Sequence, residues 1–259
     1  MLHYYHSLKD GLRIDPDRAA PLVGPVRRLL RSDLVWRLSG LTYYSAVVAT
    51  HGYFEPPSAY LAACKRQMDK FMGSIRGGSA VVEFGSGLGG NLVAVADLFS
   101  EGYGIDVNPF FVETAHRLAR RSGVSNLHFI AYNGRTLPRA IPAPDVIFSF
   151  GVFERLPKDL VRGYIRQLRD ILRPGGRMVL SFLTEAAFRT TFVHRLGSDA
   201  YVPWTTEEIQ RAARVLGLEI ESLIPHGEWP VGDGQHTLPV AMVGVFHRSV
   251  VNSLPPIDS

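Results

Sequence analysis

Residues 81–92 read Val-Val-Glu-Phe-Gly-Ser-Gly-Leu-Gly-Gly-Asn-Leu, an apolar run that ends in spaced glycines. Residues 80–84 form a short run that is largely β-branched and apolar, and such a run predicts a central parallel strand covered on both faces. Gly85, Gly87 and Gly89 carry no β-carbon and permit positive φ, so that a ligand can approach the backbone. The amides that open the next helix, expected at residues 90–99, would point at that ligand. The stretch predicts a strand, a tight turn and a helix start that hold a nucleotide-like ligand.

The strand that follows strengthens this interpretation. A glycine-rich turn also joins strands to helices where no ligand binds, and the glycine spacing alone is weak evidence. Residues 102–106 end in Asp106, about 20 residues downstream, where nucleoside-binding folds place a carboxylate on the ribose. A carboxylate at this point can accept two hydrogen bonds from a diol.

Composition and length limit the class of protein. A chain of 259 residues allows one large α/β domain, alone or with a smaller helical addition. A composition of 46% hydrophobic and 20% charged residues disfavours the disordered and membrane classes. No apolar stretch reaches the ~20 residues that span a bilayer, and the amino terminus lacks the pattern of a secretory signal. With a single cysteine, Cys64, no internal disulfide can form, and we expect a cytoplasmic protein.

The charge leaves two interpretations open. The formal net charge is +4, and most of the basic residues are arginines. Such a balance fits an anionic partner, such as nucleic acid, a phosphorylated sugar or a membrane surface. Arginines that lie on solvated helix faces explain it as well, since those near the amino terminus alternate with leucines at helical spacing. We expect no nucleic-acid partner.

Hydrophobic periodicity places the remaining elements. Three amino-terminal segments, at 26–38, 41–50 and 58–72, predict a helical lid. From residue 80 strands and helices alternate, as in a parallel sheet with helices on both faces. Strands are expected at 80–84, 102–106, 127–131, 144–150, 176–183, 218–224 and 240–247, and helices at 90–99, 109–121, 158–172 and from a capping box at 205–208. We therefore divide the chain into a lid (1–75), an α/β domain (76–250) and a tail (251–259).

Four segments in this order resemble the class I S-adenosylmethionine-dependent methyltransferases. Residues 83–89 are similar to the E-x-G-x-G-x-G motif of that family, and Asp106 to its ribose-binding acid. Residues 144–157 resemble its fourth strand and the segment that follows, and residues 172–176, Leu-Arg-Pro-Gly-Gly, resemble the turn before its fifth strand. The resemblance implies a Rossmann-like, seven-stranded and mostly parallel sheet whose last strand is antiparallel.

The same resemblance implies contacts to S-adenosyl-L-methionine. The glycine turn and its acid would hold the methionine and ribose portions, and the segment after the third strand would meet the adenine. The segment after the fourth strand would lie beside the sulfonium, and an amino-terminal aromatic stretch would close over the cofactor. The implied contact residues are Tyr44, Glu83, Gly85, Gly87, Gly89, Asp106, Val107, Asn133, Gly134, Phe150 and Gly151.

No general base follows from the resemblance, because Arg155 stands where many relatives have a histidine. The candidate bases are His51, His194, His226 and His236, of which the last two are expected between the final two strands. Each is also explained as a surface histidine. His116 and His128 fall inside regular elements and are poorer candidates. No close cluster of His, Asp or Glu has metal-ligand spacing, so no metal site is predicted, although a magnesium ion held by distant carboxylates stays an alternative.

The sequence thus predicts a methyltransferase that acts on a small molecule, most favourably on a hydroxyl oxygen of a sugar, polyketide or lipid-linked metabolite. An RNA methyltransferase is the first alternative. A NAD-dependent oxidoreductase is the second, because Gly85, Gly87 and Gly90 also satisfy the dinucleotide spacing. A cofactor-binding protein without catalysis is a third. The sequence does not indicate the oligomeric state.

Overall fold

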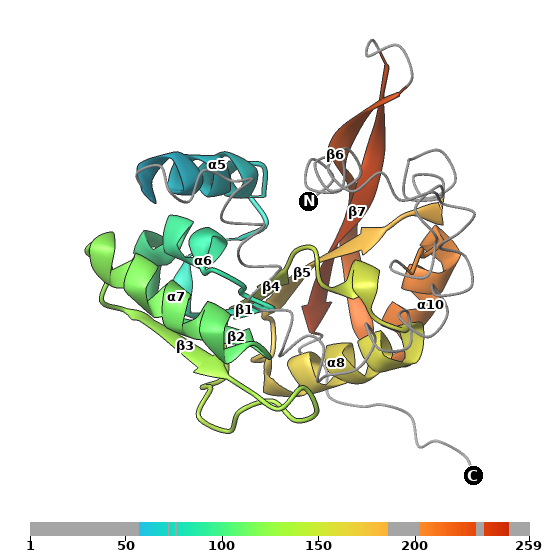
Figure 1. The fold of residues 1–259 in the computed structure, drawn as a ribbon. Helices are drawn as coiled ribbons and strands as arrows, with labels where there is room; N and C mark the ends of the chain where they lie inside the picture. Colours follow the sequence, from blue (N-terminus) through green and yellow to red (C-terminus); the bar gives the residue numbers. More distant parts are fainter. Residues whose placement is uncertain (1–56, 72, 76, 186–201, 232–235, 249–259) are drawn as a thin grey trace, which may run out of the picture.

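A computed structural model describes residues 57–71, 73–75, 77–185, 202–231 and 236–248, which are arranged around a seven-stranded sheet (Figure 1). The strands are β1 (Gly78–Phe84), β2 (Phe99–Asp106), β3 (Leu127–Ala131), β4 (Val146–Ser149), β5 (Arg177–Leu183), β6 (Leu218–Val231) and β7 (His236–Arg248). The α-helices are α5 (Pro57–Asp69), α6 (Gly90–Ala94), α7 (Pro109–Arg121), α8 (Lys158–Ile171) and α10 (Thr206–Val215), with short 3₁₀ turns η1 (Ala96–Leu98) and η2 (Phe153–Arg155).

The strand order is β3-β2-β1-β4-β5-β7-β6. The first five strands are parallel to one another, whereas β7 is antiparallel to both β5 and β6. The chain adds β2 and β3 on one side of β1 and then crosses to add β4 and β5 on the other side. Strand order therefore reverses between β1 and β4, and ligands of open α/β sheets bind outside the carboxyl ends of strands at such a point. The seven-stranded, mostly parallel sheet confirms the predicted fold.

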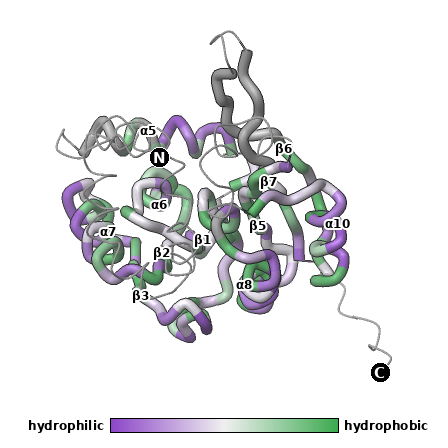
Figure 2. The backbone as a smooth tube through the Cα atoms, turned by 45° about the vertical axis from the view of Figure 1, so that its right-hand side comes forward, coloured by the Kyte–Doolittle hydropathy of each residue, from purple (hydrophilic) through white to green (hydrophobic). Residues whose placement is uncertain are grey.

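Helices cover both faces of this sheet. On one face, α8 and α10 pack on a core that includes Phe84, Ile147 and Phe182. On the other face, residues of α5, α6 and α7 surround a second core that includes Val81 and Phe148. Hydrophilic and hydrophobic residues alternate along α7, α8 and α10 (Figure 2), as expected of helices with one face on a core and one in water. The central strands are buried on both sides, as their apolar sequences predict.

Two predicted boundaries are wrong in an informative way. The helix expected at 90–99 ends at Ala94 and is followed by a 3₁₀ turn, because Phe99 already pairs with β1 opposite Gly78. The last two strands are longer than expected, so His226 and His236 lie within β6 and β7 and not between them. β6 contains Pro225 and Pro230, which it tolerates because it is the edge strand of the sheet.

The β6–β7 hairpin continues beyond the sheet. Leu183, the last residue of β5, pairs with Ala241, whereas the hairpin register continues outward to the pair Val231–His236 (Figure 1). Since β5 ends at the carboxyl edge of the parallel strands, the hairpin extends past that same edge.

Of the predicted lid, the described residues include α5 and the turn after it. Met68, Phe71 and Ile75 are almost fully buried in the core beside α6. The Phe71 ring stacks on Phe150 with 5.0 Å between ring centroids, so this part of the lid is anchored just after β4. Helices predicted at 26–38 and 41–50 lie outside the described residues. No helix in the described ranges has the length and apolar character needed to cross a membrane.

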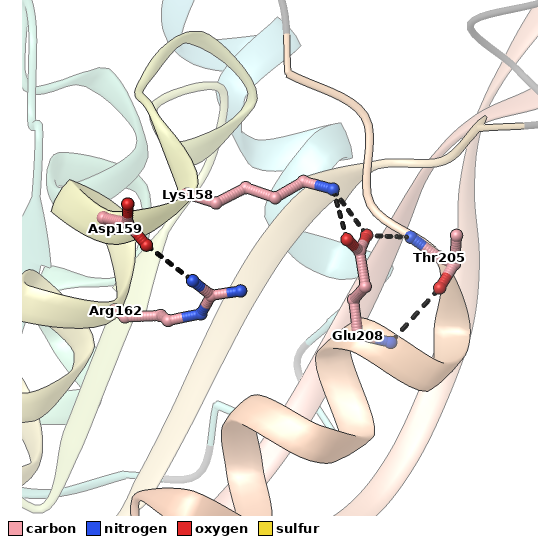
Figure 3. Close-up of polar contacts among 5 residues, drawn as sticks. All are labelled: Lys158, Asp159, Arg162, Thr205 and Glu208. Carbon is pink, nitrogen blue, oxygen red and sulfur yellow. Dashed lines mark hydrogen bonds and ion pairs between the residues drawn. The ribbon is translucent and has the colours of Figure 1, made fainter.

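The predicted capping box at the start of α10 is confirmed. The Thr205 hydroxyl accepts a hydrogen bond from the Glu208 amide at 3.2 Å, and the Glu208 carboxylate accepts one from the Thr205 amide at 2.9 Å (Figure 3). Lys158, at the start of α8, donates to both Glu208 oxygens at 2.6 Å. The same carboxylate thus closes the cap of α10 and joins it to α8.

Loss of this cap should lower stability without affecting the sheet. We expect Thr205→Ala to lower the free energy of unfolding by about 1 kcal/mol, because the Glu208 amide loses its acceptor. Thr205→Ser keeps the hydroxyl and should lie close to the wild type. Urea unfolding measures both variants, and equal destabilisation by serine and alanine would contradict the role of the cap.

Candidate functional site

The loop after β1 leaves its backbone open on one side. Gly85 and Gly87 have φ of 72° and 51°, a region that side chains rarely adopt. A β-carbon on Gly85 would clash with Val152, which packs on the loop from the turn after β4. A β-carbon on Gly87 would meet no atom of the described residues within 4 Å, so among them the loop presents bare main chain at the strand-order reversal. Gly89, with φ 78°, is the amino-terminal cap of the short helix α6.

Asp106, the last residue of β2, fixes this loop. The Gly87 amide donates to Asp106 Oδ2 at 2.9 Å, and the Asn108 amide donates to Oδ1 at 2.8 Å. The carboxylate can accept up to about four hydrogen bonds, so it keeps room to accept a ligand hydroxyl. Burial raises the pKa of the Asp106 carboxyl, while hydrogen bonds from the Asn108, Gly87 and Val107 amides oppose the rise.

Glu83 is buried one strand away, with only 2% of its surface exposed. Asn91 donates to its Oε1 at 3.2 Å, while Glu83 Oε2 and the nearby Ser86 hydroxyl have no hydrogen-bond partner among the described residues. Burial raises the pKa of Glu83 from 4.5 to about 8, and the charge of Asp106 adds to that rise, against hydrogen bonds from Asn91 and the Leu92 backbone. A neighbouring cation would favour the ionised carboxylate, so the site suits a positively charged ligand.

The turn after β4 completes the edge. The Ser149 hydroxyl donates to the Phe84 carbonyl at 2.8 Å and ties β4 to the end of β1. The Gly151 amide donates to the Ser181 hydroxyl of β5 at 3.0 Å, and that hydroxyl donates to Glu154 at 2.5 Å. Gly151 has φ 73° and, like Gly87, would place a β-carbon more than 4 Å from any other atom of the described residues. The predicted Phe150–Gly151 segment is thereby brought beside the loop after β1.

The segment after β3 is less open than the sequence suggested. The Asn133 side-chain oxygen accepts from the Arg135 amide at 2.9 Å and from the Thr136 amide at 3.1 Å, which occupies both of its lone pairs. The Gly134 carbonyl accepts from the Tyr164 hydroxyl of α8. Adenine recognition by Asn133 and Gly134 stays a prediction, and Val107 lies half-buried next to Asp106.

Two of the four candidate bases, His226 and His236, have a described backbone. Tyr44, His51 and His194 lie outside the described residues. The backbone of His226 pairs with Ala241, level with the end of β5, and His236 pairs with Val231 further out. His116 bonds the Phe129 carbonyl at 3.0 Å, and His128 stacks on Tyr103, as expected for histidines in regular elements. Among the side chains that the structure describes, no three His, Cys, Asp or Glu gather as a metal site requires.

Sequence reasoning missed the polar side chains that join the strands. Ser149 and Ser181 are single hydroxyls in the otherwise apolar carboxyl halves of β4 and β5, and Asn91 is the second residue of α6. A polar residue in a strand buried on both faces needs a partner, and this signal was available in the sequence.

Comparisons with known proteins agree with this geometry. Residues 81–176 match the family model described as "Methyltransferase domain". A protein-L-isoaspartate O-methyltransferase of Pyrococcus horikoshii is 32% identical over 108 residues, 41% of this chain and 45% of that protein. A tRNA U34 carboxymethyltransferase of Cellvibrio japonicus is 36% identical over 86 residues, 31% of this chain and 24% of that protein. The chain thus spans less than half the length of these curated relatives.

Solved structures share the fold. An S-adenosylmethionine-dependent methyltransferase from Clostridium acetobutylicum superposes with a TM-score of 0.59 at 9% identity, covering 81% of this chain and 99% of that chain.

The buried Glu83 carboxyl should make stability depend on pH. Its pKa is about 8 in the folded chain and 4.5 as an ordinary carboxyl, so the folded state keeps a proton that the unfolded state loses. Its stabilising contribution is full below pH 4.5 and is lost as pH rises toward 8. Glu83→Gln imitates the protonated carboxyl and still accepts from Asn91.

We therefore expect the ligand-free Glu83→Gln variant to gain stability over the wild type as pH rises, on the order of 2–5 kcal/mol in total, and to level off above about pH 8. Chemical unfolding of both proteins between pH 5 and 9 measures the trend. A difference that stays constant over that range would contradict the burial of an unpaired carboxyl.

Proposed function

We propose that this chain is a class I S-adenosylmethionine-dependent methyltransferase that methylates a small-molecule acceptor in the cytoplasm, and the match of residues 81–176 to a methyltransferase domain supports this proposal. The favoured acceptor atom is a hydroxyl oxygen of a sugar, polyketide or lipid-linked metabolite. The observation that carries the proposal is the pairing of the bare Gly87 backbone with the Asp106 carboxylate at the strand-order reversal.

The described residues fit S-adenosylmethionine. Asp106 would accept the ribose hydroxyls, and Val107, Asn133 and Gly134 would meet the adenine. Gly85, Gly87 and Gly89 would let the backbone approach the cofactor, and Phe150 and Gly151 would flank its methionine portion. Glu83 Oε2 has no hydrogen-bond partner among the described residues. A bound cation would favour the ionised form of this carboxyl, which would then place a negative charge in the site. When bound, the cofactor supplies an activated methyl group.

The surroundings of the carboxyl edge support a small acceptor. On one side α5 is anchored through Phe71 on Phe150, and on the other the β6–β7 hairpin extends past the end of β5 (Figure 1). Two elements that flank the edge restrict the direction from which an acceptor approaches and help to hold it in line for transfer. We infer that residues 1–75 form a lid that completes this enclosure, with Tyr44 closing over the cofactor.

A hydroxyl acceptor benefits from a base that removes its proton. We infer that the base is one of His51, His194, His226 and His236. We favour His226 among the four, because its backbone pairs with Ala241, which in turn pairs with Leu183 at the end of β5.

RNA is the rival acceptor, and one observation favours it. The relative from Cellvibrio japonicus is, by its name, a tRNA U34 carboxymethyltransferase. That similarity covers 31% of this chain and 24% of that protein, so most of both chains lies outside it. The small-molecule proposal and the RNA proposal therefore differ in the acceptor and share the cofactor.

Asp106 should control affinity for the cofactor. We expect Asp106→Ala to weaken binding of S-adenosylhomocysteine by about 10- to 100-fold, because hydrogen bonds to a charged group are worth ~1.5–3 kcal/mol. Asp97→Ala, an exposed carboxylate before the amino end of β2, is the matched control and should bind as the wild type does. Titration calorimetry measures both, with NADH as a ligand expected not to bind. Equal affinities of the Asp106→Ala and wild-type proteins for S-adenosylhomocysteine would contradict the proposed ribose contact.

The acceptor class can be read from labelled extracts. The full chain is incubated with tritiated-methyl S-adenosylmethionine and a lysate of the producing organism, which is then separated into small molecules, RNA and protein. We expect the label in the small-molecule fraction as a base-stable ether. Label that is precipitated by acid and released by ribonuclease would establish the RNA alternative instead.

A further inference from the structure

A chain of hydrogen bonds holds the turn after β4 from behind. The Gly151 amide donates to Ser181 at 3.0 Å, and Ser181 donates its single hydroxyl hydrogen to Glu154 Oε1 at 2.5 Å. Ser181 is 2% exposed and Glu154 is 8% exposed, so water does not compete for these bonds. Neither side chain has a role in the function proposed above.

The first of these bonds sets the direction of one peptide plane. In a trans peptide the carbonyl of residue 150 and the amide of residue 151 point in opposite directions, and no described peptide bond is cis. Because β4 lies between β1 and β5, an amide that points at Ser181 on β5 turns the Phe150 carbonyl toward the side of β1. That side holds the glycine loop, against which Val152 of the same turn packs at Gly85.

Glu154 sets the direction in which the Ser181 hydroxyl donates its hydrogen bond. A hydroxyl donates one hydrogen bond, and here the carboxylate takes it. The Ser181 oxygen is therefore left with its lone pairs toward the Gly151 amide. The backbone of Glu154 also accepts from the Val202 amide at 2.7 Å, which fixes this residue to the strand-like segment that leads into α10.

We propose that Ser181 and Glu154 are positioning residues, an inference that rests on the proposed function. They fix the 150–151 peptide so that its carbonyl faces the aminocarboxypropyl portion of the cofactor. An ammonium group that meets this carbonyl gains a charge-assisted hydrogen bond only while the peptide keeps that orientation. The pair acts through the main chain and does not touch the cofactor.

Two ligands separate this role from general support of the fold. S-adenosylhomocysteine carries the aminocarboxypropyl group, whereas 5′-methylthioadenosine has the same adenosine and thioether without it. Calorimetry on the full chain compares Ser181→Ala, Ser181→Cys, Glu154→Ala and Glu154→Gln with the wild type. Thr205→Ala, which loses a hydroxyl hydrogen bond at the α10 cap, is the matched control. Ser181→Cys keeps the side-chain volume and serves if the alanine variant does not fold.

We expect Ser181→Ala, Ser181→Cys and Glu154→Ala to weaken the binding of S-adenosylhomocysteine about tenfold, the loss typical of one good hydrogen bond. The affinity of the same variants for 5′-methylthioadenosine should stay within about twofold of the wild-type value. Glu154→Gln should rescue binding, because its amide oxygen still accepts the Ser181 hydroxyl. Equal loss for both ligands, or no loss for either, would overturn the positioning role. A wild-type chain that binds neither ligand would instead overturn the proposed function itself.

Discussion

The site depends on the two hydrogen bonds that Asp106 accepts, from the Gly87 amide at 2.9 Å and from the Asn108 amide at 2.8 Å. They join the loop after β1 to the end of β2 and hold a glycine at φ 51°, where no described side chain covers its main chain. The same carboxylate keeps room to accept a ligand hydroxyl. One side chain therefore shapes the loop and offers the ligand its polar contact.

This arrangement brings two acidic side chains into a buried region. Burial raises the pKa of both Glu83 and Asp106, and the charge of Asp106 raises the pKa of Glu83 further. The ligand-free chain thus carries an unfavourable electrostatic environment that a cationic ligand would relieve. Binding sites often break local rules of stability in this way, and the well-packed cores on both faces of the sheet compensate. The hydrogen bonds of Ser149 on β4 and Ser181 on β5 hold the turn after β4 in place on the other side of the site.

The sequence predicted the parallel part of the fold because its signals are local. The apolar run before Gly85, the helix from Pro109 to Arg121 and the capping box at Thr205 each depend on neighbouring residues, and each is found as expected. The length of the β6–β7 hairpin was missed because the pairing of the two strands with each other sets it, and a local sequence pattern does not record that pairing. The link from Gly151 to Ser181 and Glu154 was missed because it joins residues 27 to 30 positions apart, which no periodicity records. The roles of the cofactor residues and of the four histidines stay predictions.

The most direct test of the central claim is a crystal structure of the chain with S-adenosylhomocysteine. The account predicts the ribose hydroxyls at about 3 Å from the Asp106 carboxylate, with the Gly87 amide still bonded to it and the sulfur beside the turn at Gly151. A nucleoside bound elsewhere, or one whose ribose leaves Asp106 without contact, would contradict it.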